Sequence, residues 1–278
     1  TGSVRMLQGL HTTFVSGGHD YANFQVFAVR DSPGSKNAYF KLTSSNAPFP
    51  IPTLRSPKFL DVYDNNTWNL SVRVKPRNYP RAGLVSGSMA GQSSYPYDVV
   101  FKGTNAFLGT IQNSFEVTGT MSPVSNTALR FVQSPKRVYV GAQRTNLTGT
   151  VIRKSDVLVG SARYWTKYID DYTLAQHTKD ILNTGISGSY RNISALQKQG
   201  KNHDMLNRNT LALDWNFQRL SSSFATGRFY VKDYSSGSAT LRQKYSWLGK
   251  ISGYQHTGYG YGFVTSSSDI ATDSSVIK

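Results

Sequence analysis

The sequence predicts an all-β protein with antiparallel sheets and one short helix. The chain of 278 residues contains 17 Tyr and 14 Phe, and these side chains, like Val and Thr, suit the half-buried surface of a sheet. Helix-forming residues are scarce, and Glu116 is the one glutamate of the whole chain. Short alternating segments separated by turns recur roughly every ten residues, which is the spacing typical of a β-sandwich.

Two segments show the period-two alternation of a half-buried strand most clearly. Residues 68–76 alternate large apolar with polar side chains and stop at a proline, and residues 211–217 place every second, apolar side chain on one face. Pro33 fixes φ and Gly34 permits a positive φ, so residues 31–34 are predicted to form a turn. Further strands are expected at residues 24–29, 38–42, 97–101, 107–111, 114–118, 129–132, 138–142, 148–152, 157–159, 162–165 and 229–233.

Two local signals modify this pattern. The prolines between residues 48 and 57 lack amide donors, so we expect an extended edge strand or a rigid strap there. Asp170 and Asp171 precede residues 172–181, and aspartate at a helix start accepts free amide hydrogen bonds and suits the positive end of the helix dipole. We therefore expect a short helix that packs its apolar side on a sheet.

The composition of the chain changes after residue 182. Residues 183–209 are rich in Gly, Ser, Asn and Lys and show little periodicity, so a linker or long loop is expected there. The predicted organisation is therefore a β-sandwich over residues 1–182, the linker over 183–209, and a second β-rich segment over 210–278. This last segment either packs on the sandwich or stands apart from it.

The formal net charge of +16 attracts anions, and the candidate partners are nucleic acid, an acidic polysaccharide or an acidic neighbouring subunit. The densest basic pairs, Lys136-Arg137 and Arg153-Lys154, are far apart in the sequence. A nucleic-acid-binding protein more often has a basic stripe or a known motif. Nucleic acid is therefore the disfavoured partner.

The chain has no cysteine, which fits a protein assembled in a reducing cytosol. No apolar run is long enough to predict a membrane span, and no signal peptide is visible. Because the chain begins with Thr1, we expect a processed product or a piece of a longer polypeptide.

Residues 68–76, 137–181, 210–218 and 227–239 together resemble the laminin-G/concanavalin A-like module of large virion structural proteins of marine tailed phages. The resemblance implies a concanavalin-like antiparallel β-sandwich, or jelly roll, with one short helix and a smaller β-rich part after it. It also implies a non-enzymatic structural or recognition module of a phage tail, baseplate, fibre or capsid surface. Such a module is assembled in the host cytoplasm, resides in the extracellular particle, and contacts other virion subunits in an oligomeric assembly.

A module of this kind is also expected to bind neutral or anionic glycans of the host surface. Aromatic rings would stack on sugars and arginines would bind acidic groups, so tyrosines and arginines in predicted loops are the candidates. The candidate ligand-binding residues are Tyr79, Arg81, Tyr95, Tyr97, Arg144, Tyr259 and Tyr261.

The same resemblance implies a Ca²⁺ ion at the rim of the sandwich. Asp61, Asp64 and Asn65 would supply the hard oxygen ligands that calcium prefers. The alternative interpretation is a turn in which these side chains cap the strand that begins at Trp68. No other cofactor is expected.

An enzyme is not expected. A glycoside hydrolase needs two carboxylates that flank the scissile bond, whereas Glu116 stands alone. The chain has no G-x-S-x-G nucleophile motif and no metal-type histidine spacing, and His177 is interpreted as a packing or surface residue. The alternatives to a virion module are a bacterial secreted adhesin or carbohydrate-binding module and, less favoured, a glycoside hydrolase.

Overall fold

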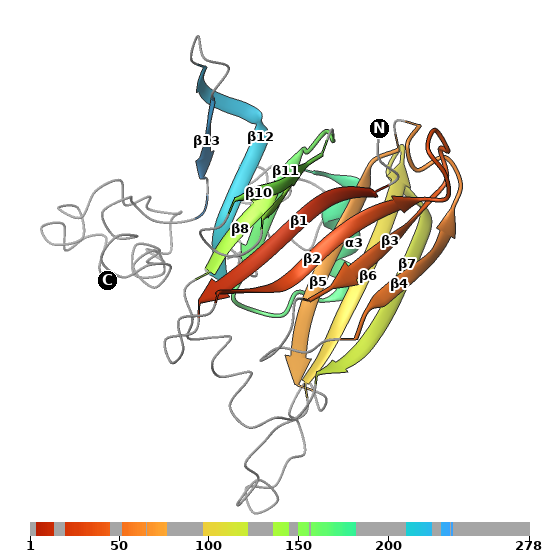
Figure 1. The fold of residues 1–278 in the computed structure, drawn as a ribbon, viewed down its shortest axis with the longest axis horizontal. Coiled ribbons are helices and arrows are strands. Elements are labelled where there is room, and N and C mark those ends of the chain that lie inside the picture. The colour runs from red at the N-terminus through yellow and green to blue at the C-terminus, as the bar shows by residue number, and fades with distance from the viewer. Residues whose placement is uncertain are drawn as a thin grey trace, which may run out of the picture. The chain divides into compact units, whose positions relative to one another are not determined.

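The computed structural model confirms the all-β class. Its described part contains thirteen strands in antiparallel sheets and one helix (Figure 1). In the described part of the chain, no helix is both long enough and apolar enough to cross a membrane. The described residues are 4–13, 20–44, 52–64, 66–76, 97–121, 136–144, 150–155, 157–181, 210–223, 229–233 and 235.

The chain divides into two compact units. The first contains residues 1–106 and 111–159, and the second contains residues 107–110 and 160–278. The helix at residues 171–179 groups with the later strands. The predicted strand at 129–132 and the predicted linker at 183–209 lie outside the described residues.

The first unit contains a five-stranded sheet with the order β4-β3-β2-β1-β8. Strands β1 to β4 pair in chain order, and β8 returns to lie beside β1, as the fourth strand of a Greek key does. The predicted turn between β2 and β3 is confirmed, with Gly34 at a φ of 87°. Pro57 lies in β4 at the edge of this sheet, where a missing amide donor is tolerated. The strands are β1 (Val4–Thr13), β2 (Asp20–Arg30), β3 (Ala38–Thr43), β4 (Leu54–Phe59) and β8 (Lys136–Val140).

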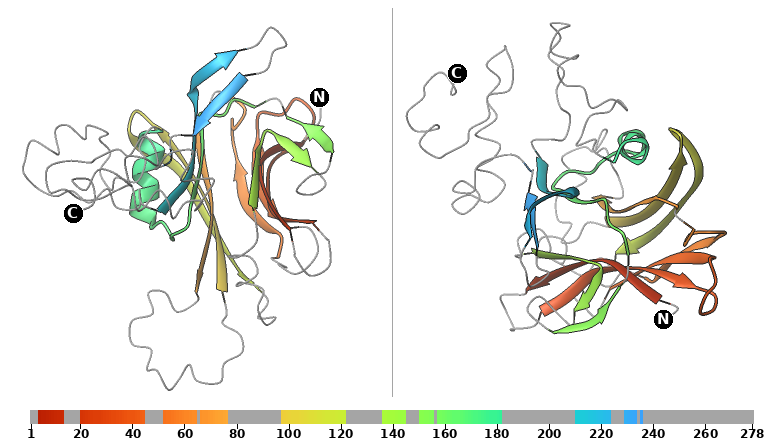
Figure 2. Two further views of the ribbon diagram at one scale, coloured as in Figure 1. Left: turned by 90° about the vertical axis from the view of Figure 1, so that its left-hand side faces the viewer. Right: turned by 90° about the horizontal axis from the view of Figure 1, so that it is seen from above.

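A three-stranded sheet with the order β5-β6-β7 lies opposite the five-stranded sheet (Figure 2). Its strands are β5 (Trp68–Pro76), β6 (Tyr97–Phe107) and β7 (Thr110–Met121). The prediction of a strand at 107–111 is wrong, because Leu108 and Gly109 have φ angles of 49° and 78°. Two successive positive φ angles are typical of a two-residue hairpin turn, so β6 and β7 form one long hairpin.

Five aromatic side chains from the two sheets form the aromatic core of the first unit. The Trp68 ring lies 4.9 Å from that of Phe40 and 4.8 Å from that of Phe59, centroid to centroid. Phe40 is stacked on Phe115 at 5.7 Å, and Phe101 meets Phe115 edge-on at 5.1 Å. Since Phe40 and Phe59 come from one sheet and the other three rings from the second, this cluster holds the two sheets together.

A short ribbon follows β8 in the first unit. Gly141, with a φ of 68°, separates β8 from β9 (Ala142–Arg144), which pairs with β10 (Val151–Lys154). Of the strand predicted at 148–152, residues 151 and 152 belong to β10, and residues 148 and 149 lie outside the described residues. Residues 157–159, also predicted as a strand, form none. All four residues of β10 are exposed.

The second unit contains the helix α3 (Asp171–Lys179) and a three-stranded sheet with the order β11-β12-β13. The predicted helix start is confirmed, because the Asp170 carboxylate accepts a hydrogen bond from the Thr173 amide at 2.7 Å. The buried face of α3 includes Leu174 and His177. The strands are β11 (Ser161–Trp165), β12 (Leu211–Ser223) and β13 (Phe229–Asp233).

Candidate functional site

The outer face of strands β3 and β4 is the candidate site. In β3 the side chains of Ala38, Phe40 and Leu42 are buried, and the alternating side chains of Tyr39 and Lys41 are only half-buried. Because neighbouring residues of a strand point to opposite sides, Tyr39 and Lys41 lie on the face that points away from the aromatic core. The burial pattern of the chain thus fixes which residues the first unit presents to solvent here.

Strand pairing places positive charges together on this face. Lys41 pairs directly with Arg55 of β4, and Tyr39 pairs with Lys58. The Arg55 guanidinium carbon lies 3.7 Å from the centroid of the Tyr39 ring, which is the geometry of a cation–π contact. We call Tyr39, Lys41 and Arg55 the basic face.

The neighbouring lysines of the basic face are already ion-paired. Lys58 Nζ lies 2.9 Å from the Asp31 carboxylate, and Lys36 Nζ lies 2.8 Å from that of Asp64. Within the described part of the chain, no carboxylate pairs with Lys41 or Arg55. The basic face therefore combines two cations that lack an acidic partner among the described residues with a ring that orients one of them.

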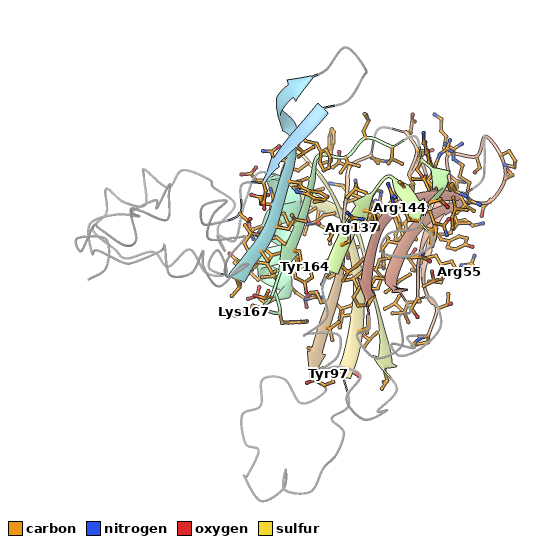
Figure 3. All side chains as sticks on the ribbon, turned by 60° about the vertical axis from the view of Figure 1, so that its left-hand side comes forward. Arg55, Tyr97, Arg137, Arg144, Tyr164 and Lys167 are labelled. Atoms are coloured by element: carbon orange, nitrogen blue, oxygen red, sulfur yellow. The ribbon has the colours of Figure 1, made fainter. Side chains whose placement is uncertain are left out.

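A second group of cations lies on strands β8 to β10. Arg144 lies with its guanidinium carbon 5.0 Å from the Tyr139 ring centroid. Arg153 and Lys154 are exposed on β10. Arg137 pairs with His11 of β1, and Arg144 pairs with Val151 of β10; both arginines are labelled in Figure 3. The two basic pairs of the sequence, Lys136-Arg137 and Arg153-Lys154, thus lie on β8, which pairs with β1, and on β10, which pairs with β9.

The structure places two of the predicted ligand-binding residues and does not bring them together. Tyr97 is half-buried at the start of β6, opposite Pro76. Arg144 lies on β9, far from Tyr97 in Figure 3. The other candidates, Tyr79, Arg81, Tyr95, Tyr259 and Tyr261, lie outside the described residues.

The contacts of the predicted calcium ligands are those of a turn. The Asp61 carbonyl accepts hydrogen bonds from the Asp64 amide at 3.0 Å and the Asn66 side chain at 2.8 Å. The Asp64 carboxylate binds Lys36 and raises the pKa of that lysine above its ordinary value of 10.5. An ion at Asp64 would have to displace the Lys36 ammonium. Asn65 lies outside the described residues, and those described contain no group of three acidic or histidine side chains suited to a metal.

Glu116, the one glutamate, lies on the face of β7 opposite to Phe115. Its Oε2 atom is 3.1 Å from Lys102 Nζ and 3.4 Å from Arg73 Nη2. The Arg73 side chain is only 5% exposed, and a buried cation needs a nearby negative charge. This carboxylate therefore neutralises a buried arginine.

The second unit has a polar core that the sequence did not reveal. Arg163 Nε lies 2.8 Å from Asp214 Oδ1, and their side chains are 7% and 4% exposed. Arg163 also donates to the Ile181 carbonyl at 2.6 Å, and the Asp233 carboxylate accepts from the Asp214 amide at 3.0 Å. Asp214 alternates with the apolar residues of β12, and this alternation predicts a strand with one apolar side and one polar side. Asp214 is nevertheless buried.

His177 is a buried packing residue in this unit. Its ring stacks on Trp165 with the centroids 5.3 Å apart. Burial, together with the nearby Arg163 charge, lowers the pKa of His177 to about 4. Burial also raises the pKa of Tyr164 to about 12. Both groups are therefore neutral near pH 7, because burial disfavours the charged form of each.

No protein-family model, curated protein or solved structure matches the chain.

Proposed function

We propose that this chain is a non-enzymatic structural and recognition module of a virion. It would contact neighbouring subunits and use the first unit to bind glycans of a host surface. The observation that carries the recognition role is the basic face, where Lys41 and Arg55 lack an acidic partner among the described residues. The virion assignment rests on a sequence resemblance to structural modules of tailed phages. The residues that carry it are 68–76, 137–181, 210–218 and 227–239.

The proposal includes a concanavalin-like β-sandwich for the first unit. Two antiparallel sheets that share an aromatic core support it, since sandwiches bury the inner faces of two sheets against each other. The Greek-key relation of β8 to β1 supports it as well.

The contacts of Glu116, Asp214 and His177 support a role without catalysis. Glu116 binds Lys102 and Arg73, and Asp214 binds Arg163. His177 is buried against Trp165. A general acid or base has to reach the substrate. Asp214 and His177 are buried, and the partly exposed Glu116 is already ion-paired with two cations.

Two measurements test the proposal. Mass spectrometry of density-purified particles from the source of this chain should detect its peptides. Their presence in cell extracts but not in particles would contradict the virion role. A glycan array with the purified chain should show binding without release of shorter sugars, and cleavage of any bound glycan would overturn the non-enzymatic assignment.

The second candidate is a secreted bacterial adhesin or carbohydrate-binding module. The basic face favours it equally, because charge and aromatic rings on rigid strands suit any surface-binding module. Recovery of the peptides from the bacterial surface rather than from particles would select this alternative.

A further inference from the structure

The direct pairing of Lys41 with Arg55 is the most informative feature of the basic face. Directly opposed residues on one face of an antiparallel pair have Cβ atoms about 4.5–5.5 Å apart, and like charges there are destabilising. The neighbouring cations Lys36 and Lys58 each have a carboxylate within 3 Å. Lys41 and Arg55 have none in the described part of the chain. An anion bound between them would remove this repulsion.

The Tyr39 ring orients one of the two cations. A guanidinium 3.7 Å above the ring lies against an aromatic surface, while its N–H groups point outward from its edge in a fixed fork. Such a fork matches the two oxygens of a carboxylate or sulfate group. The Lys41 ammonium supplies further donors on the same face.

The backbone beneath these side chains is fixed by burial. Phe40 and Leu42 on β3 are at most 2% exposed, and Leu54 on β4 is 5% exposed. Ser56 adds a hydrogen bond from the Phe40 amide at 2.9 Å. Sites on strands held in this way are more precise than sites on loops, so the cations need little ordering when an anion binds.

The composition of the face distinguishes between classes of partner. The exposed large apolar side chains of the described residues are on other elements, whereas a stable protein–protein interface has an apolar centre. Nucleic acid binding gains its affinity from many cations along the phosphate backbone, whereas only two cations of this face lack a carboxylate partner among the described residues. A ligand with separate carboxylate or sulfate groups on a polar framework fits best. The exposed large apolar residues are Leu60, Phe107, Leu108, Val151, Ile152, Leu158 and Tyr172.

We propose that Lys41 and Arg55, with Tyr39 as the support of Arg55, bind a carboxylate or sulfate group of an acidic glycan. This inference rests on the recognition role proposed above and gives that role a ligand class and a site. The binding is a charge-assisted contact with no covalent step.

Lysine, arginine and proline on an edge strand also have a protective role, because they prevent pairing with other chains. Pro57 and Lys58 of β4 fit that role. Arg55 differs, because its guanidinium lies across the sheet face over Tyr39. A purely protective role predicts that loss of Arg55 promotes aggregation and leaves glycan binding unchanged.

The test compares two variants with the same change in charge. The double variant Lys41→Gln/Arg55→Gln removes the basic face, and Arg153→Gln/Lys154→Gln removes two exposed cations from β10. The full chain is titrated with a sulfated oligosaccharide, a uronic-acid oligosaccharide, neutral dextran and duplex DNA, at low and high salt. Circular dichroism and Tm verify that each variant is folded.

The expected result is that the first variant binds at least one acidic oligosaccharide about tenfold or more weakly, because charge-assisted hydrogen bonds are lost. The β10 variant should change by less than about threefold. Tyr39→Leu should weaken binding by an intermediate factor, since Arg55 loses its support.

Equal losses of oligosaccharide binding in the two double variants would overturn the inference, because binding would then depend only on the total charge of the chain. Tighter binding of duplex DNA than of any acidic oligosaccharide would also overturn it and assign the face to nucleic acid. If the wild type binds only neutral glycans, the inference fails while the recognition role stands. If it binds no glycan but is present in particles, the inference fails and a structural role remains.

Discussion

The cores of the two units differ in the kind of interaction that holds them together. The first unit packs aromatic rings from two sheets, including Phe40, Trp68 and Phe115. The second places an ion pair, Arg163–Asp214, in its interior. Apolar packing is non-directional and does not depend on protonation, whereas a buried ion pair is favourable only while both partners are present and charged. The two units should therefore respond differently to mutation and to pH.

The largest expected effect is the loss of a ring from the aromatic core. Phe40 is 2% exposed, and Phe40→Ala should lower the free energy of unfolding of the first unit by about 3–5 kcal/mol. Urea unfolding at neutral and acid pH should give a similar loss. Phe59→Ala is the matched control, and it should lose less because Phe59 is only half-buried. Equal losses at both positions would contradict a core centred on Phe40.

Removal of one charge from the second unit should have an effect of nearly the same size. Asp214→Asn leaves the Arg163 guanidinium buried without its carboxylate, which costs about 3–5 kcal/mol. The double variant Arg163→Leu/Asp214→Leu replaces both charges with apolar groups and should recover most of that loss. Chemical denaturation of the three proteins measures the difference. A single variant as stable as the wild type would show that the ion pair contributes nothing.

Acid should weaken the second unit through His177. Its pKa is about 4 in the folded chain against an ordinary 6.5, so the unfolded state binds the proton first as pH falls. Stability should therefore be full above pH 6.5 and decline toward pH 4, by up to about 3 kcal/mol. Arg163 opposes protonation and Asp170 favours it.

The measurement is Tm against pH for the wild type and His177→Leu. The variant should show a shallower decline between pH 6.5 and pH 4. Identical profiles for the two proteins would assign the acid sensitivity to the carboxylates instead.

The smallest expected effect is at an ion pair on the surface. Lys58 and Asp31 lie 2.9 Å apart with side chains 51% and 34% exposed, and exposed pairs contribute about 0–1 kcal/mol. Lys58→Gln should thus change the unfolding free energy by less than about 1 kcal/mol, and added salt should abolish the difference. A loss as large as that of Asp214→Asn would remove the distinction between buried and exposed pairs.

Local signals in the sequence predicted the elements that depend on neighbouring residues. The Trp68 strand, the turn at Gly34 and the helix start at Asp170 all follow from side chains a few positions apart, and all three are confirmed. The sequence pattern predicts a strand at residues 107–111, where the structure has the turn between β6 and β7. Leu108 has a positive φ in this turn, at a position where Gly, Asn or Asp is usual.

The sequence pattern does not predict which strands pair across long stretches of the chain. Asp214 and Arg163 meet because β12 pairs with β11, and nothing near either residue indicates its partner. The basic face likewise exists only through the register of β3 with β4. The candidate tyrosines and arginines were chosen by residue type and predicted loop position, and this choice does not include Lys41 or Arg55. The two candidates that the structure describes, Tyr97 and Arg144, lie in strands β6 and β9.

The pairing of β1 with β8 has a consequence for synthesis of the chain. Leu10 pairs with Val138. One edge of β1 therefore lacks its β8 partner until the ribosome has made more than half of the first unit and β8 has emerged. Strands β2, β3 and β4 can meanwhile form their hairpins from local contacts. Closure of such a distant pair is slow, and an open strand edge can pair with other nascent chains. In many copies made side by side, the arrival of β8 would set the time during which this protein is prone to aggregate.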